Sequence, residues 1–393
     1  MSLRFTAGRA IPYWRLSSFY FFYFALLGTI VPFLGLYLQS LHFSSIEIGQ
    51  IFAVMMVTRV LAPNIWGWLA DHTGRRLFVI RLGSFLAWVC FSFILWQQDF
   101  VWVALIIATY SFFWNAVLAQ FEVVTLNYLG GVSHYYSRIR LWGSVGFIVA
   151  VVLLGYLFDF ISLSYMPLAA LVILVLIWLS SLTVKEQKTV TLVHEHGEGF
   201  WQVCRGRPVL CFLAASFFLQ VSFGSYYTFY SVYLEGLSYS RGEIGLLWAL
   251  GVLAEVVVFW FMHRLLTFYS LRSVMMLTLA ATVVRWWLIG FYPDFIWVLF
   301  SAQLLHAFSF GTAHAVAIEL VRRFFVGRHQ GQGQALYSAV SFGAGGAIGS
   351  LLSGWLWGVS PQLSFAVSAL SAALAFLLVW WGLRGRRVEV VVS

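Results

Sequence analysis

Residues 47–49 of this 393-residue chain read Glu-Ile-Gly, and residues 243–245 read Glu-Ile-Gly again, 196 positions later. Each triplet opens a long apolar segment. The same offset aligns Arg59 in the first segment with Glu255 in the second, and each is the charge in the interior of its segment. The repeat indicates two copies of one unit with opposite charges at equivalent positions. Because an ionisable side chain inside lipid is costly, both residues are functional candidates.

The composition points to lipid as the solvent. Hydrophobic residues make up 62% of the chain and charged residues 9%, whereas soluble domains carry about 25% charged residues. A soluble fold could not cover so much apolar surface. A membrane-spanning helix needs about 20 mostly apolar residues, and the segments that meet this need are roughly 14–39, 45–70, 76–97, 101–128, 138–158, 162–183, 208–235, 241–266, 271–291, 295–321, 331–358 and 361–383.

We expect all of these segments to be helices. In lipid, only helices and closed barrels hydrogen-bond every N–H and C=O group within the protein. Barrel strands alternate between apolar and polar residues, whereas these segments are continuously apolar. The predicted fold class is therefore an all-α integral membrane protein with twelve transmembrane helices.

The net charge of +9 is distributed in a way that favours a membrane orientation over binding to nucleic acid. With the N-terminus cytoplasmic, 20 Lys and Arg residues fall at one face and only Arg241 falls at the other. This is a strong positive-inside bias. It predicts a multi-pass protein of a bacterial-type inner (plasma) membrane with both termini cytoplasmic, and no nucleic acid partner.

One long polar stretch, 184–207, divides the chain into an N-terminal bundle of six helices, 1–183, and a C-terminal bundle of six helices, 208–393. We expect the stretch to be a cytoplasmic linker, and the repeat offset of 196 agrees with the division. Parallel repeats of this kind let one class of transporter build a site between its halves.

The chain offers no sequence signal for a metal, a cofactor or an enzyme. The run His194-Glu195-His196 lies in the linker, and adjacent residues rarely converge on one ion, so we interpret it as a solvated loop. We find no nucleophile–base set and no phosphate loop, which argues against a membrane-embedded enzyme.

The loop between the second and third segments carries a family signature. Residues 67–76 read Gly-Trp-Leu-Ala-Asp-His-Thr-Gly-Arg-Arg, which resembles the signature loop of the major facilitator superfamily, with a histidine at the first basic position. We expect Gly67 to end a helix and Gly74 to permit a turn. Asp71 is expected to cap a neighbouring helix and to pair with an arginine. The matching positions, which the resemblance implies form a cytoplasmic gate, are Gly67, Asp71, Gly74, Arg75 and Arg76.

Further stretches resemble the phenylpropionate-permease branch of this superfamily, whose relatives are oligosaccharide:proton and nucleoside:proton symporters. The resemblance spans essentially the whole chain and implies two pseudo-symmetric six-helix bundles, a transport function and a monomer. The stretches are 137–146, 251–256, 284–286, 303–306 and 334–338.

Lactose permease, a member of the superfamily, permits a comparison of single residues. Glu122 and Arg140 keep the spacing of 18 residues that separates its sugar-binding glutamate from the paired arginine. Arg285 and His306 resemble a further arginine and histidine. Three residues after that histidine the permease has a proton-carrying glutamate, whereas this chain has Ser309. The resemblance therefore implies that a proton carrier, if present, lies elsewhere.

Glu122 and Glu255 are the candidate proton carriers, and Glu255 is the first choice to replace the missing acid. A carboxylate in low dielectric can bind and release a proton near neutral pH when its surroundings tune it. We expect Arg140 to be the charge partner of Glu122 and Arg285 that of Glu255. The alternative for each pair is a static salt bridge between helices.

The remaining candidates are cationic or titrate near neutral pH. Arg59 could bind a substrate carboxylate in a bidentate manner, although a structural pairing is the alternative. His306 and His314 lie eight residues apart, which places them about 80° apart around an ideal helix. We therefore expect at most one of them to face the cavity squarely, where it could bind substrate or shuttle a proton.

Aromatic residues make up 19% of the chain, and most are expected to face lipid or the membrane interface. The segments that the resemblance implies line the cavity carry concentrated sets, which include Tyr23, Trp114 and Tyr227. Rings together with arginines would suit a planar aromatic acid. The amides and hydroxyls nearby would equally serve a sugar or a nucleoside.

These observations favour a secondary active transporter that takes up a small aromatic carboxylate with protons and needs no cofactor beyond the proton. Three alternatives stay open at this stage: a sugar or nucleoside symporter, an efflux transporter, and a sensor that kept the fold without transport.

Overall fold

The computed structural model describes residues 11–130, 133–185 and 199–384, and within these ranges all regular structure is helical. Twelve helical stretches there are long and apolar enough to cross a membrane. Each matches one of the twelve predicted segments to within a few residues, so the predicted fold class is confirmed.

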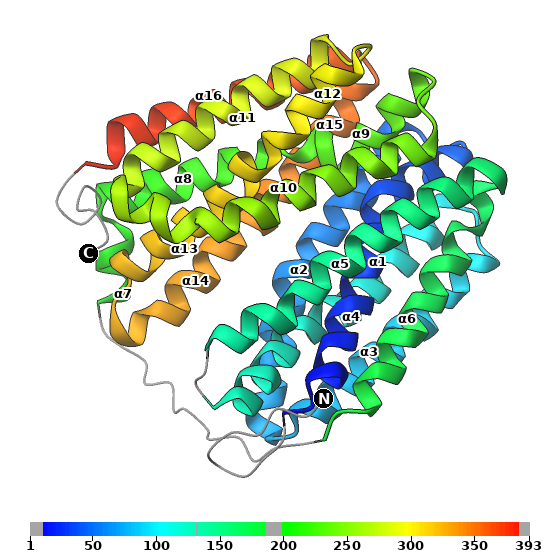
Figure 1. The fold of residues 1–393 in the computed structure, drawn as a ribbon, viewed down its shortest axis with the longest axis horizontal. Coiled ribbons are helices and arrows are strands. Elements are labelled where there is room, and N and C mark those ends of the chain that lie inside the picture. The colour runs from blue at the N-terminus through cyan, green and yellow to red at the C-terminus, as the bar shows by residue number, and fades with distance from the viewer. Residues whose placement is uncertain (1–10, 131–132, 186–198, 385–393) are drawn as a thin grey trace. The chain divides into compact units, whose positions relative to one another are not determined.

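Six of the stretches belong to the N-terminal half, where each is one long, nearly continuous helix (Figure 1). A 3-10 turn, η1 (Phe93–Leu95), extends the third helix, and another, η2 (Leu163–Tyr165), precedes the sixth. The helices are α1 (Tyr13–Ser40), α2 (Ser45–Thr73), α3 (Arg76–Ser92), α4 (Phe100–Leu129), α5 (Ser133–Phe160) and α6 (Met166–Leu182).

The other six stretches follow a short helix, α7 (Phe200–Cys204), and three of them are interrupted. The first divides into α8 (Arg207–Ser222) and α9 (Gly224–Gly236). Two more contain a π-helical segment, with the orders α12 (Ile296–Leu304), η3 (Ala307–Thr312), α13 (Ala313–Phe324) and α14 (Gln330–Ser338), η5 (Ala339–Gly345), α15 (Gly346–Trp357). The uninterrupted helices are α10 (Arg241–Phe268), α11 (Leu271–Phe291) and α16 (Pro361–Gly382), and a 3-10 turn, η4 (Gly327–His329), precedes α14.

The repeated Glu-Ile-Gly triplets begin α2 and α10 because each forms part of a capping box. The backbone N–H of Ser44 donates to a Glu47 carboxylate oxygen at 2.8 Å, and the Glu47 N–H donates back to the Ser44 hydroxyl at 3.3 Å. Ser240 and Glu243 make the same pair of bonds at 2.8 and 3.2 Å. The sequence repeat is thus a repeat of one helix start.

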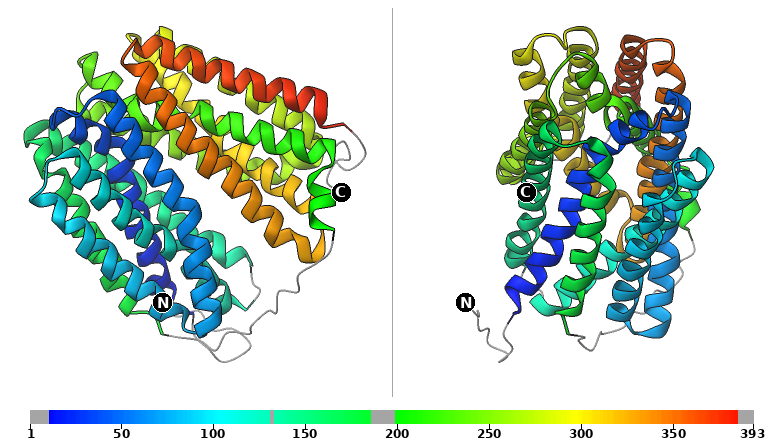
Figure 2. Two further views of the ribbon diagram at one scale, coloured as in Figure 1. Left: turned by 180° about the vertical axis from the view of Figure 1, so that it is seen from behind. Right: turned by 90° about the vertical axis from the view of Figure 1, so that its right-hand side faces the viewer.

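The same packing scheme recurs inside each half (Figure 2). In the N-terminal half α1 packs on α5 and α6, and α3 packs on α4 and α6. In the C-terminal half the corresponding helix α8 packs on η5 and α16, while α11 packs on η3 and α16. Repeated connectivity therefore produces repeated tertiary contacts, as expected for parallel repeats.

The contacts divide the chain into two compact units whose limits differ from the predicted halves at two places. One unit comprises Met1–Phe43, Val57–Leu192 and Ser240–Gly245, and the other comprises Ser44–Met56, Val193–Tyr239 and Leu246–Ser393. The starts of α2 and α10 thus each belong to the unit formed mainly by the opposite half. Residues 186–198 of the predicted linker, including His194, Glu195 and His196, lie outside the described residues, as do 1–10 and 385–393.

Close backbone contact holds α1 and α5 together. A Cβ atom at Gly146 would overlap the carbonyl oxygen of Phe21, and one at Gly28 would lie 2.6 Å from the carbonyl oxygen of Phe147. Small residues at helix interfaces let backbones approach in this way, which is a main source of packing energy in lipid.

We predict that Gly146→Ala lowers the stability of the protein by about 1–3 kcal/mol, because the added methyl group overpacks the α1–α5 contact. The measurement is the midpoint of thermal unfolding in detergent. The matched control is Gly236→Ala, since a Cβ there meets no atom within 4 Å. Equal midpoints for the two variants would show that the α1–α5 contact is looser than the structure indicates.

Candidate functional site

An acid–base pair joins α4 to α5 in the N-terminal unit. The Arg140 Nε atom lies 3.9 Å from a Glu122 carboxylate oxygen, and about one third of each side chain is accessible. The Tyr136 hydroxyl donates to the same oxygen at 3.2 Å. The Arg140 guanidinium also lies 3.9 Å from the centre of the Phe24 ring, a cation–π distance. The two residues that the resemblance paired therefore lie together, and their carboxylate is partly accessible.

Stacked rings from α1 and α4 lie in the same unit. The rings of Tyr23 and Trp114 stack at 4.8 Å, and Trp114 stacks on Tyr110 at 6.3 Å. The Trp114 Nε1–H and the Tyr110 hydroxyl are buried without a hydrogen-bond partner among the described residues. Because buried polar groups are normally paired, these two are candidates to bind a polar ligand or water.

Arg59 lies on α2 in the N-terminal unit, and its side chain is exposed there. Its neighbour Thr58 is buried and shares a hydrogen bond of 2.8 Å with Ser111 of α4. These observations do not test whether Arg59 binds a carboxylate, so that role stays a prediction.

The signature loop forms a tight ionic cluster, with two departures from expectation. Arg76 forms an ion pair with Asp71 and also donates to the Gln120 amide oxygen of α4. Gly74 has a left-handed φ of +65°, so it permits the predicted turn. However, α2 runs on to Thr73, so Gly67 lies inside a helix rather than at its end.

The second departure concerns the start of α3. Its N-cap residue is Arg75, and no side chain caps it. The Asp71 carboxylate pairs with Arg76 instead, because a guanidinium binds a carboxylate more strongly than a single backbone N–H group does.

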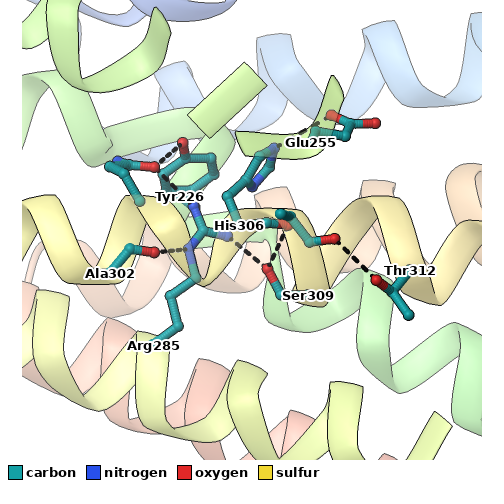
Figure 3. A network of polar contacts seen from close by, with 9 residues as sticks. Tyr226, Glu255, Arg285, Ala302, His306, Ser309 and Thr312 are labelled. Carbon is teal, nitrogen blue, oxygen red and sulfur yellow. Dashed lines mark hydrogen bonds and ion pairs between the residues drawn. The ribbon is translucent and has the colours of Figure 1, made fainter. Parts of the chain in front are cut away.

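Arg285 is the most deeply buried charge of the C-terminal unit. None of its surface is accessible, and its guanidinium donates to the Ala302 carbonyl at 3.0 Å, the Ser309 hydroxyl at 3.1 Å and the Gln303 amide oxygen at 3.3 Å (Figure 3). The Tyr226 hydroxyl donates to the same Gln303 oxygen at 3.1 Å.

Rings enclose the faces of this guanidinium. Its central carbon lies 4.2 Å from the centre of the Tyr226 ring and 4.5 Å from that of Trp286. Among the described residues no carboxylate lies within 4.0 Å of Arg285. The cation is therefore held by neutral groups and by aromatic faces.

Glu255 lies beside His306, and Arg285 makes no ion pair with it. The His306 Nε2 atom lies 3.9 Å from a Glu255 oxygen, and 7% and 18% of the two side chains are accessible (Figure 3). The predicted pairing of Glu255 with Arg285 is wrong in this respect, because the hydrogen bonds of Arg285 are directed to residues of the tenth membrane span.

The π-helical segment η3 changes the predicted geometry of the two histidines. Phe310 stacks on His306 with an interplanar angle of 2° and on His314 with an angle of 8°, at centroid distances of 5.6 and 6.4 Å. Because a π-turn contains more residues than an α-turn, the angle of about 80° expected for an ideal helix does not apply. His306, Phe310 and His314 form one stack.

Trp286, which lies against Arg285, and Phe310, which joins the histidines, were not predicted as site residues. Tyr226 and Gln303 belong to the rings and amides of the predicted cavity segments, but their contacts with Arg285 were not predicted. The spacing of Gln303 and His306, three residues apart on one helix, is a signal that could have linked Gln303 to the site. The predicted Tyr227 stacks on Phe223 at 5.4 Å. Among the described residues no group of three metal-ligating side chains occurs.

Comparisons with known proteins identify relatives over nearly the whole chain. The family described as "MFS_1 like family" matches residues 13–367. The chain is 27% identical to the "Probable 3-phenylpropionic acid transporter" of Escherichia coli (strain K12), over 91% of this chain and 95% of that protein. It is 25% identical to the "Maltose permease" of Geobacillus stearothermophilus, over 92% and 93%. The solved structure of the nucleoside transporter NupG matches with a TM-score of 0.80 at 18% identity, over 94% of this chain and 98% of that chain.

We predict that the Glu122–Arg140 ion pair contributes little to stability, because a partly exposed pair at 3.9 Å is worth about 1 kcal/mol or less. Glu122→Gln, Arg140→Gln and the double variant form a thermal-unfolding cycle whose coupling energy should stay within that limit. Transport should nevertheless fall more than tenfold in Glu122→Gln.

Glu319→Gln is the contrasting control for the long Glu122–Arg140 contact. It removes a carboxylate that forms short ion pairs of 2.9 Å with both Arg322 and Arg323. A large coupling energy for Glu122 and Arg140, together with normal transport by Glu122→Gln, would identify the pair as a static salt bridge.

Proposed function

Because the chain belongs to the MFS_1 like family and is a transporter of the major facilitator type rather than an enzyme, we propose that it takes up a small aromatic carboxylate together with protons. Its halves would alternate between inward-open and outward-open states. The strong positive-inside bias supports a bacterial-type inner membrane with both termini cytoplasmic. The observation that carries the substrate class is the environment of Arg285.

A buried guanidinium without a carboxylate is expensive in a low-dielectric interior. Arginine side chains are effectively always charged in proteins, and the hydrogen-bond partners of Arg285, which are Ala302, Gln303 and Ser309, are neutral. An incoming carboxylate would supply the missing negative charge. The aromatic rings of Tyr226 and Trp286 beside the cation would favour a substrate with a planar ring.

The proton-binding group of the proposal is the Glu255–His306 pair. Both side chains are largely buried, and His306 lies three residues from Gln303, which holds Arg285. A proton shared by the pair would offset part of the charge that the substrate brings. We expect symport because the proton and the negatively charged substrate would move across the membrane together.

The relatives support transport of this kind without fixing the substrate. One relative is described as a transporter of 3-phenylpropionic acid, which is an aromatic carboxylate. Another is a maltose permease, and this favours a sugar as the second candidate. The amide of Gln303 and the hydroxyl of Tyr226 are groups that a sugar would also use.

We predict that external acid accelerates uptake into vesicles, because the proton gradient drives the substrate inward. Glu255→Gln should abolish accumulation and retain exchange of external for internal substrate, since exchange needs no net proton movement. Radiolabelled uptake and counterflow measure the two. Glu243→Gln is the matched control on the same helix, because glutamine preserves the capping box. Accumulation by Glu255→Gln would show that Glu255 is structural, and uptake unaffected by external acid would exclude the coupling.

We further predict that Arg285→Lys weakens binding of 3-phenylpropionate at least tenfold, because lysine lacks the planar fork that binds carboxylates. The measurement is a thermal-shift and calorimetric screen of wild type and variant against aromatic acids, the corresponding amides, maltose and nucleosides. The amides, which are neutral, should not bind the wild type. Preferential stabilisation by maltose or a nucleoside would favour the second candidate instead.

A further inference from the structure

Two buried glycines lie at the contact between α10 and the tenth membrane span, Ile296–Phe324. A Cβ atom at Gly311 of η3 would come within 2.8 Å of the Glu255 Cγ atom, whereas the next nearest atoms lie 3.6 Å away. A Cβ atom at Gly251 of α10 would lie 3.2 Å from the Gln303 Oε1 atom and 3.3 Å from the His306 Cδ2 atom. Each glycine therefore makes room for polar side chains of the facing span.

The two contacts are arranged so that Glu255 and His306 meet. Gly251 and Glu255 lie four residues apart on α10, so they share one face of that helix. His306 and Gly311 lie five residues apart, which is the hydrogen-bond period of a π-helix, and η3 is π-helical. The His306 ring lies against Gly251, and the Glu255 side chain lies against Gly311. As a result a Glu255 carboxylate oxygen lies 3.9 Å from the His306 Nε2 atom (Figure 3).

A methyl group on residue 311 would displace the Glu255 side chain rather than the backbone. The atom in its way is Cγ, which moves when the Glu255 side chain rotates about its first bond. The side chain is 18% accessible, so it has a way to turn from His306. Because the attraction between two charges falls with their separation, the displaced carboxylate would stabilise a protonated His306 less.

We propose that Gly311 is a positioning residue for proton coupling, because its lack of a side chain keeps the Glu255 carboxylate beside His306. The inference rests on the proposed function, in which the Glu255–His306 pair binds the transported proton. It assigns a role to a residue of the π-helical segment that touches neither the substrate nor the proton. Gly311 was not among the predicted site residues.

The first test measures acid-driven accumulation and counterflow exchange of radiolabelled 3-phenylpropionate in vesicles that hold the full-length protein. Gly311→Ala should lower accumulation by about tenfold, because the two proton-binding groups are separated. It should retain exchange, which needs no net proton movement.

Gly290→Ala is the matched control. A Cβ atom there would lie 2.6 Å from the Phe365 Cβ atom, so the variant overpacks a contact between two uncharged residues. Its ratio of accumulation to exchange should equal that of wild type.

A second test measures the packing separately from transport. Thermal unfolding in detergent is recorded for wild type, Gly311→Ala, Glu255→Ala and the double variant. Adding the methyl group should shift the midpoint about 2–4 °C less favourably in wild type than in the Glu255→Ala background, where the obstructing Cγ atom is absent. Equal shifts in the two backgrounds would show that Glu255 does not occupy the space beside Gly311, and would overturn the assignment.

The outcomes separate this inference from the proposed function. If external acid accelerates uptake by wild type and Glu255→Gln loses accumulation, normal accumulation by Gly311→Ala overturns the positioning role while the function stands. Loss of accumulation and exchange in equal proportion by Gly311→Ala also overturns it, since that result identifies a purely structural glycine. If external acid does not accelerate uptake by wild type, the function and the positioning role are both overturned.

Discussion

The low dielectric of the bilayer is the constraint on which the whole structure depends. It forces every backbone N–H and C=O group to find a partner inside the protein, which explains why all regular structure in the described residues is helical. It also makes each ion costly, so that the few buried charges are the candidates for a functional site. Arg285 shows the consequence most directly, because three neutral groups and two aromatic faces surround a charge that has no carboxylate within 4.0 Å among the described residues.

The interrupted helices occur in the half that holds the most deeply buried charge. The N-terminal half has long continuous spans, whereas the π-segments η3 and η5 lie in the C-terminal half, and η3 contacts Arg285 through Ser309. A wide turn leaves part of the backbone less tightly bonded and shifts side chains around the helix. Thr312 illustrates the local repair, since its hydroxyl donates to the Ala307 carbonyl, five residues earlier, at 3.3 Å.

The two halves have kept one architecture and diverged in chemistry. Both start their second helix with the same capping box, and the internal packing of one half corresponds to that of the other. The N-terminal half contains an accessible pair, Glu122 and Arg140, while the C-terminal half contains an enclosed cation and a carboxylate paired with a histidine. Opposite charges at the repeat-related positions Arg59 and Glu255 belong to this divergence.

The sequence by itself determined the fold class and the twelve spans, because hydropathy and helix period are local properties of a chain in lipid. The pairing of Glu122 with Arg140 was implied by the resemblance to lactose permease. The sequence did not determine that Glu255 pairs with His306, that Asp71 leaves α3 uncapped, or that His306 and His314 share one stack. Those outcomes depend on which side chains compete for the same partner across helices, and on two π-turns that no local pattern announced. Tertiary packing decided them, because the angle of a side chain around its helix matters only when a neighbouring helix is present.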